Sequence, residues 1–274
     1  MSSFDAPYIT VNSEAIFLAS LNDDTDVVYS YKISTRKKLN CNKPCILHEA
    51  NDNAFDFYDI SIAQGTFATR AETADGVMSM FIFDRKSKKL IQKIPDNYNY
   101  LNQRKPVILG GPSYFSEKLA FSAYSRDIDN KIISAIYSNA GGNNYAEPVV
   151  RSGKVYKSIN TAFTYRVRNP TLYLEDDKAL IAFMGYPFNG KDATGVYLAK
   201  IDKGKVKLST IAVPGQVVGE NMVIRTATIG AVSLRKGIIP LLIKLFNGQE
   251  LIAVVNLNKK RAVRAEGSAA HLNL

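Results

Sequence analysis

A pattern of two short strands joined by a tight turn returns five times along the chain. The five copies begin near Ile9, Ile60, Ser113, Thr171 and Thr228. Their apolar runs are short and rich in β-branched and aromatic residues, which favours strands over helices. Because a repeat of this kind sets the architecture of a whole chain, we interpret it before any single motif.

Each copy of the pattern is followed by a third strand and then by a weaker fourth one. The third strands are predicted at 27–31, 77–81, 132–136, 196–199 and 251–255. A basic turn, such as Lys203-Gly204-Lys205, separates the third strand from the fourth in four of the five units. One unit therefore holds four strands and repeats at roughly 50 to 60 residues.

This repeat predicts an all-β fold, a five-bladed β-propeller with four antiparallel strands per blade. A single four-stranded meander leaves its apolar faces uncovered, whereas blades packed around an axis bury both faces. The predicted blades of a single domain, 1–274, are approximately 5–54, 55–105, 106–160, 161–220 and 221–274. A β-sandwich or a pair of small β-domains is the alternative.

The composition is that of a folded globular chain. Hydrophobic residues make up 46% of the sequence and charged residues 22%, which excludes a disordered chain. The two cysteines exclude a disulfide-dense scaffold, and the absence of Trp argues against propeller families that depend on tryptophan motifs. The formal net charge of +10 favours anionic partners through long-range attraction.

The segments that lead into the innermost strands of a propeller line its central funnel, where ligands usually bind. In the first two units these segments carry carboxylates, Asp5, Asp56 and Asp59. We expect Asp59 to contact a ligand. The alternative is a structural role, in which these carboxylates form ion pairs with arginines at the polar centre of the ring and bind no ligand.

Arginines dominate the corresponding segments of the last three units. The predicted ligand-binding residues there are Arg104, Arg166, Arg168, Asn169 and Arg225. A guanidinium group stays charged and offers a planar fork to carboxylate, phosphate or hydroxyl oxygens. The sequence therefore predicts a site for a carbohydrate-like or anionic ligand.

The stretch from Arg166 to Phe183 places Arg168-Asn169-Pro170 before an acidic turn and an apolar strand. It resembles the Arg-Asp-Pro blade of five-bladed propeller glycosidases of the levansucrase, invertase and arabinanase type. The resemblance implies a five-bladed propeller with catalytic carboxylates at the starts of the inner strands. Asn169 replaces the aspartate of that pattern, so the resemblance supports the fold more than the activity.

The leading prediction is a non-catalytic binding propeller that engages such a ligand, or a protein partner, at its funnel and rim. The alternative is a glycoside hydrolase, which needs two carboxylates about 5 to 9.5 Å apart. Its candidate catalytic residues are Asp5, Asp56 or Asp59, and Glu220. Whether the chain is an enzyme stays open at this point.

A protein-binding rim would use aromatic side chains as anchors, with Tyr165, Tyr186 and Phe188 as candidates. No nucleotide loop or nucleic-acid module is recognised, so we expect no sequence-specific nucleic-acid binding. The most apolar stretch, 237–246, is about half the length of a membrane span. The first residues lack the features of a signal peptide, and a secreted or periplasmic mature form is favoured over a cytoplasmic protein.

No cofactor or metal site is predicted. The acidic loops 23–26, 72–75 and 127–129 could hold Ca²⁺, although Asp is common in turns for conformational reasons. Cys41, Cys45 and His48 have the spacing of three zinc ligands without a fourth, so we expect a disulfide or free thiols.

Overall fold

The computed structural model consists of strands connected by turns and loops. It describes residues 3–4, 8–9, 14–20, 26–32, 45–49, 56–63, 65–72, 78–84, 86–87, 89–95, 108–126, 129–142, 146–187, 193–218, 221–230, 234, 236–257 and 261–264. Among these, side chains are described except at 3–57, 62–63, 93–95, 132, 164–165 and 261–264. The chain divides into two compact units, Met1–Tyr98 and Asn99–Leu274.

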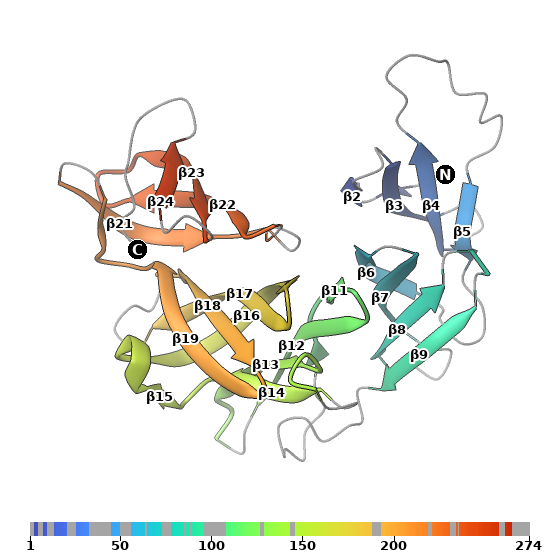
Figure 1. Ribbon diagram of the computed structural model, residues 1–274, viewed down its shortest axis with the longest axis horizontal. Helices are drawn as coiled ribbons and strands as arrows, with labels where there is room; N and C mark the ends of the chain where they lie inside the picture. The colour runs from blue at the N-terminus through green and yellow to red at the C-terminus, as the bar shows by residue number, and fades with distance from the viewer. Residues whose placement is uncertain are drawn as a thin grey trace. The chain divides into compact units, whose positions relative to one another are not determined.

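The first unit contains two antiparallel sheets (Figure 1). The first sheet consists of β1 (Ser3–Phe4), β2 (Tyr8–Ile9), β3 (Glu14–Ser20), β4 (Asp26–Lys32) and β5 (Cys45–Glu49). The second consists of β6 (Asp56–Ala63), β7 (Thr66–Glu72), β8 (Met78–Asp84) and β9 (Leu90–Pro95). Both β1 and β2 pair with β3, and from β3 onward each strand of a sheet pairs with its neighbour in sequence.

The second unit contains three more sheets, in which consecutive strands pair except that β10 and β11 both pair with β12 (Figure 1). The third sheet consists of β10 (Ile108–Leu109), β11 (Ser113–Phe115), β12 (Lys118–Arg126), β13 (Ile132–Ser138) and β14 (Glu147–Arg151). The fourth consists of β15 (Val155–Tyr156), β16 (Thr161–Glu175), β17 (Lys178–Pro187), β18 (Gly195–Asp202) and β19 (Lys205–Ala212). The fifth consists of β20 (Val217–Val218), β21 (Met222–Thr228), β22 (Ile238–Leu245), β23 (Glu250–Asn256) and β24 (Arg261–Arg264).

The prediction of an all-β chain is confirmed. Within the described residues the one helix is a single 3-10 turn, η1 (Lys157–Ile159), and every strand pairing in the five sheets is antiparallel. The short loops explain this order, because a tight turn joins consecutive strands only in an antiparallel arrangement. At the turn between β18 and β19, Lys203 and Gly204 have φ angles of 48° and 75°, as a two-residue hairpin turn requires.

Two apolar clusters join the three sheets of the second unit. One lies between the third and fourth sheets and includes Ile136, Phe163 and Tyr197. The other lies between the fourth and fifth sheets and includes Met184 and Leu241. Each face of the fourth sheet is therefore buried over part of its area against a neighbouring sheet, which is the stacking that the repeat predicted on grounds of burial.

Buried hydroxyl groups also connect these sheets at equivalent positions of the repeat. The Oγ of Ser113 accepts a 2.8 Å hydrogen bond from the Leu172 N–H, and the Oγ1 of Thr171 accepts a 3.0 Å bond from the Leu234 N–H. Ser113 and Thr171 each lie opposite an alanine of the following strand. The Ser113 hydroxyl thus attaches β11 to the fourth sheet, and the Thr171 hydroxyl attaches β16 to the connection between β21 and β22. Each bond satisfies a buried backbone donor.

Strand β21 was not predicted. The sequence predicted the first strand of the last two-strand pattern after Thr228, in a stretch that the structure describes only in part, and β21 ends at Thr228 and pairs with β22. The polar residues Arg225 and Thr226 interrupt the apolar run of β21, so the strand was not recognised. The short strands β15 and β20 were also missed, because two residues are too few to show an alternating pattern.

Candidate functional site

Five of the predicted site residues have described side chains. Asp59 lies on β6 in the first unit, while Arg166, Arg168 and Asn169 lie on β16 and Arg225 on β21 in the second. The remaining candidates lie outside what the structure describes: Asp5, Arg104 and Glu220 entirely, and Asp56 in its side chain. Their predicted roles stay predictions.

The local shape of β16 explains how its polar residues are presented. Pairing with β17 loses register between Phe163 and Val167 and again between Arg168 and Thr171. At the second irregularity Asn169 has a φ of 51°, a left-handed conformation that asparagine tolerates better than most residues. Such bulges redirect side chains away from the regular pleat, which is why they often occur at functional sites.

Arg168 is held against an aromatic ring. Its guanidinium carbon lies 5.5 Å from the centroid of the Tyr186 ring on β17. Its Nε atom is buried, and no described residue accepts a hydrogen bond from it. A buried donor without an acceptor costs roughly 1–3 kcal/mol. Arg168 is therefore ready to donate to an oxygen supplied from outside the described residues.

Arg166 reaches across to the neighbouring sheet. Its guanidinium carbon lies 5.1 Å from the centroid of the Tyr124 ring on β12. Contact with a ring face is worth about 0.5–2 kcal/mol and leaves the N–H groups at the guanidinium edge available. Arg166, Arg168 and Asn169, with the two tyrosine rings, are here named the arginine segment.

Asn169 and Arg225 contribute differently. Asn169 is exposed, and its Nδ2 donates a 3.7 Å hydrogen bond to the Met184 sulfur. Arg225 is exposed on β21. The structure therefore places three of the predicted residues on β16 of the fourth sheet and Arg225 on the fifth sheet.

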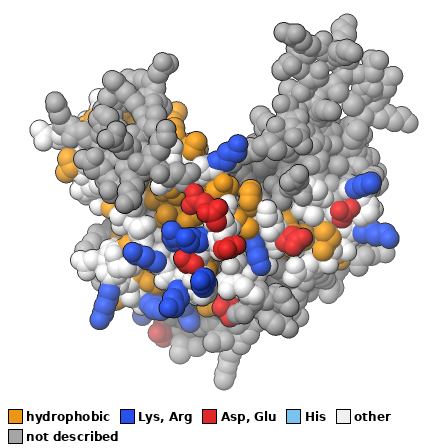
Figure 2. Space-filling view, viewed as in Figure 1, with side chains coloured by type: hydrophobic (Ala, Val, Ile, Leu, Met, Phe, Trp, Pro, Cys, Tyr) orange, Lys and Arg blue, Asp and Glu red, His pale blue; other side chains and the backbone are white. Residues whose placement is uncertain are grey.

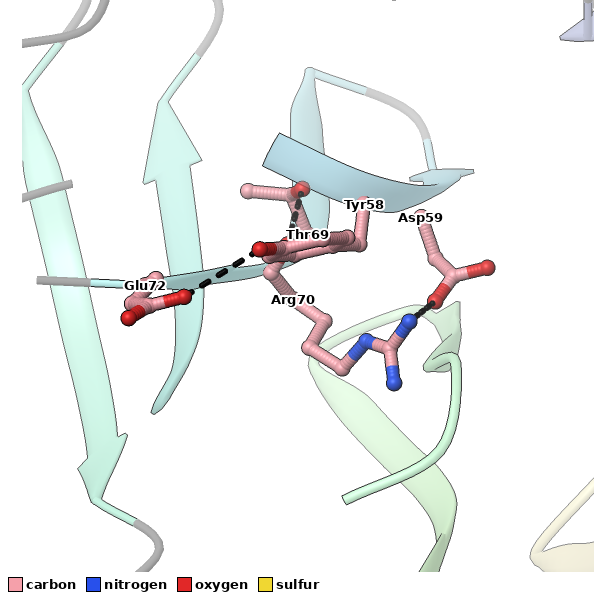
Figure 3. A network of polar contacts seen from close by, with 5 residues as sticks. All are labelled: Tyr58, Asp59, Thr69, Arg70 and Glu72. Carbon is pink, nitrogen blue, oxygen red and sulfur yellow. Dashed lines mark hydrogen bonds and ion pairs between the residues drawn. The ribbon is translucent and has the colours of Figure 1, made fainter. Parts of the chain in front are cut away.

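Asp59 belongs to a polar network of the first unit (Figure 3). Its Oδ2 lies 2.9 Å from Nη2 of Arg70 on β7. The Arg70 guanidinium carbon lies 5.1 Å from the Tyr58 ring centroid, and the Tyr58 hydroxyl donates a 3.1 Å bond to Glu72 Oε2. Arg70 was not among the predicted site residues, because it lies within a strand. Its position directly opposite Asp59 explains why the two side chains form an ion pair.

Asp59 and Asn169 occupy the same place in the repeat, two residues before the buried hydroxyl of their strand. Asp59 forms an ion pair with Arg70 on β7. Asn169 instead contacts Met184, which occupies the equivalent position on β17. The ion pair of β6 is thus replaced on β16 by an uncharged contact. As a result, Arg168 has no counterion among the side chains that the structure describes.

The other predicted features lie largely outside the described side chains. Tyr186 is half-buried under Arg168, whereas the side chains of Tyr165 and Phe188 are not described. In the described part of the chain no three His, Cys, Asp or Glu residues group closely enough to hold a metal ion. No helix there is long and apolar enough to cross a membrane. Cys41, and the side chains of Cys45 and His48, lie outside this part.

No known protein-family profile matches the chain, and no curated protein sequence matches it. Among solved structures, an acylaminoacyl peptidase from Pyrococcus horikoshii is 13% identical, with a TM-score of 0.49 over 90% of this chain and 36% of that one. The β-propeller domain of the Trilobed protease from Pyrococcus furiosus is 11% identical, with a TM-score of 0.43 over 92% and 81%. An endo-arabinase from Bacteroides thetaiotaomicron is 14% identical, with a TM-score of 0.41 over 97% and 90%.

These similarities are distant. The chain spans only about a third of the peptidase, and all three TM-scores are below 0.5. No ligand, reaction or partner follows from them for this chain. The chemistry of its site therefore rests on its own residues.

Proposed function

We propose that the chain is a non-catalytic binding protein for a carbohydrate-like, anionic small ligand held by the arginine segment. The observation that carries this proposal is Arg168, whose buried Nε has no acceptor among the described residues while its guanidinium lies against Tyr186. A ligand carboxylate would complete the hydrogen bonding of that group. Charge-assisted bonds of this kind are about twice as strong as neutral ones.

The surrounding residues support a ligand that combines a carboxylate with hydroxyl groups. Arg166 supplies a second cation, and in the described part of the chain no ion pair neutralises either arginine. The exposed amide of Asn169 can both donate and accept hydrogen bonds, as recognition of hydroxyl groups requires. A uronic acid has both kinds of group.

We further propose that the five sheets are the blades of one five-bladed propeller, with the arginine segment facing its funnel. The stacked sheets of the second unit and the bonds from Ser113 and Thr171 support this proposal. Hydroxyl residues recur at the corresponding place in the other three units, at Thr10, Ser61 and Ser233. A recurring bond between blades would explain why each unit keeps a hydroxyl there.

The glycoside hydrolase alternative stays a prediction without specific support. Asp59, the one candidate carboxylate with a described side chain, is engaged by Arg70 at 2.9 Å. The replacement of the family's aspartate by Asn169 removes a carboxylate from the place where that family needs one. Both features favour binding over hydrolysis.

Calorimetric titration with glucuronate, and with glucose as the neutral counterpart, tests the proposed function. We expect glucuronate to bind more tightly than glucose, and Arg168→Ala to weaken glucuronate binding at least about tenfold, the effect of one lost charge-assisted bond. Arg168→Lys should restore only part of the affinity, because lysine keeps the charge and loses the planar fork.

Arg126→Ala is the matched control, because Arg126 is an exposed arginine of β12 whose Nη1 donates to the Asn130 carbonyl at 3.1 Å. It should bind glucuronate like the wild type. Equal binding by the wild type and Arg168→Ala, or no preference for glucuronate over glucose, would overturn the proposed site. Turnover of aryl-glycosides by the wild type would overturn the non-catalytic function.

A further inference from the structure

One face of the fourth sheet gathers lysines from three adjacent strands. Lys178 on β17 lies opposite Asp202 on β18, which lies opposite Lys205 on β19. In the next row Lys200 on β18 lies directly opposite Lys207 on β19. Glu175 on β16 lies opposite Lys178 as well, and directly opposed residues of antiparallel strands share a face, so four lysines and two carboxylates lie together. The four lysines are here named the lysine face.

The lysine face carries an excess of positive charge. Lys178 lies 3.9 Å from Asp202, while Lys200, Lys205 and Lys207 are exposed and have no ion pair within the described part of the chain. Figure 2 shows Lys and Arg side chains gathered where Figure 1 places β18 and β19, with acidic side chains among them. The spacing along a strand puts Lys205 and Lys207 only about 7 Å apart.

Placing Lys200 opposite Lys207 is unfavourable for folding, because like charges directly across two strands repel. Protection of an exposed sheet edge explains lysines on the outermost strand, β19. It does not explain Lys178 and Lys200, which lie on interior strands of the sheet. A charged partner that spans several lysines accounts for all four.

We propose that the lysine face binds a linear acidic polysaccharide, which carries sulfate or carboxylate groups along its length. The aromatic ring in the same row as Lys200 and Lys207 is Tyr173 on β16, opposite Leu180, and it packs against the apolar cluster between the fourth and fifth sheets. The exposed lysines therefore have no neighbouring ring in this row that is free to stack on a base. Single-stranded nucleic acids are bound largely through stacking on such rings, and point charges alone suit a polymer that is recognised by its charge. This inference is independent of the arginine segment, which lies on β16.

Binding to dextran sulfate, to polygalacturonate and to an oligo-dT strand at increasing salt concentrations tests the proposal. The wild type should bind both polysaccharides with an affinity that falls steeply as salt rises. The double variant K200E/K207E should bind at least about tenfold more weakly at low salt, and its slope against the logarithm of salt should be shallower by about two contacts. The oligo-dT strand should bind more weakly than either polysaccharide.

The double variant K86E/K89E is the matched control, because it makes the same change in net charge at two exposed lysines of the first unit. It should retain polysaccharide binding. A loss equal to that of K200E/K207E would mean that net charge alone attracts the polymer, and would overturn the proposal. Oligo-dT binding as tight as dextran sulfate binding, with the same sensitivity to K200E/K207E, would overturn it in favour of nucleic acid.

The single variant K200E separates a loss of binding from a loss of folding. It replaces a repulsive pair with an attractive one opposite Lys207, so the melting temperature should rise by about 1–3 °C. Polysaccharide binding should fall at the same time. If K200E raises the melting temperature and leaves binding unchanged, the lysine face is not the binding surface.

Discussion

Buried hydroxyl groups on β11 and β16 accept hydrogen bonds from backbone N–H groups of the following segments. Thr171 is 1% exposed, and its Oγ1 accepts the N–H of Leu234 at 3.0 Å. Thr171→Ala would leave that buried N–H without an acceptor and should reduce the free energy of unfolding by about 1–3 kcal/mol. Urea denaturation of the variant measures this loss.

Thr171→Ser is the conservative comparison, because it keeps the hydroxyl and removes only a methyl group. It should recover most of the stability that Thr171→Ala loses. Ser209→Ala, at an exposed hydroxyl, should have almost no effect. Equal losses in Thr171→Ala and Thr171→Ser would show that the methyl packing, and not the bond to Leu234, stabilises this position.

Asn169 determines whether Arg168 is available to a ligand. Asn169→Asp would place a carboxylate beside an arginine whose buried Nε has no acceptor in the described part of the chain. We expect that carboxylate to pair with Arg168 and to weaken glucuronate binding at least about tenfold at neutral pH. Calorimetric titration measures the change, and unchanged affinity would contradict this role of Asn169.

At the scale of the elements, aromatic packing against β13 and β18 makes the second unit sensitive to alkali. Tyr137 on β13 is 3% exposed, and burial raises its pKa to about 12 despite the lowering effect of Arg151. Burial likewise raises the pKa of Tyr197 on β18, which stacks on Phe183 at 5.7 Å. The folded second unit therefore favours the neutral form of both phenols.

A raised pKa in the folded state stabilises the protein below the pKa of the unfolded state, which is about 10 for tyrosine. The free energy of unfolding should therefore be constant up to about pH 10 and fall as the pH rises toward the folded pKa of Tyr137, about 12. Urea denaturation at several pH values between 8 and about 11.5 measures the fall. Tyr197→Phe should reduce it, and a stability that stays level throughout would contradict the burial of ionisable phenols.

At the scale of the whole molecule, the recurring two-strand pattern was enough to predict an all-β chain and most of its strand pairs. The pattern is strong where apolar residues alternate with turn residues, as at Ser113 and Thr171. It fails at β21, whose polar residues hide the strand, and at the two-residue strands, which carry no periodicity. The local sequence therefore predicts a strand only where burial of one face produces alternating apolar and polar residues.

The placement of three candidate residues on one strand could be predicted from the sequence, whereas their contacts could not. Arg166, Arg168 and Asn169 were selected because they precede an inner strand, and the structure places them together on β16. Their aromatic partners, Tyr124 and Tyr186, were not linked to them, because one is about forty residues away on another sheet and both contacts depend on strand register. The Asp59–Arg70 pair was missed for the same reason.

The proposed function requires Arg168 to donate its Nε–H to an acidic ligand, and the NMR signal of this group reports on that bond. In arginine-labelled protein the Nε–H resonance of Arg168, identified by its loss in Arg168→Lys, should shift on addition of glucuronate and reach a plateau. Glucose should cause a smaller change, and the resonance of Arg126 should stay in place. The proposed function would be contradicted if the Arg168 resonance does not move at saturating glucuronate, or if it moves only together with the Arg126 resonance.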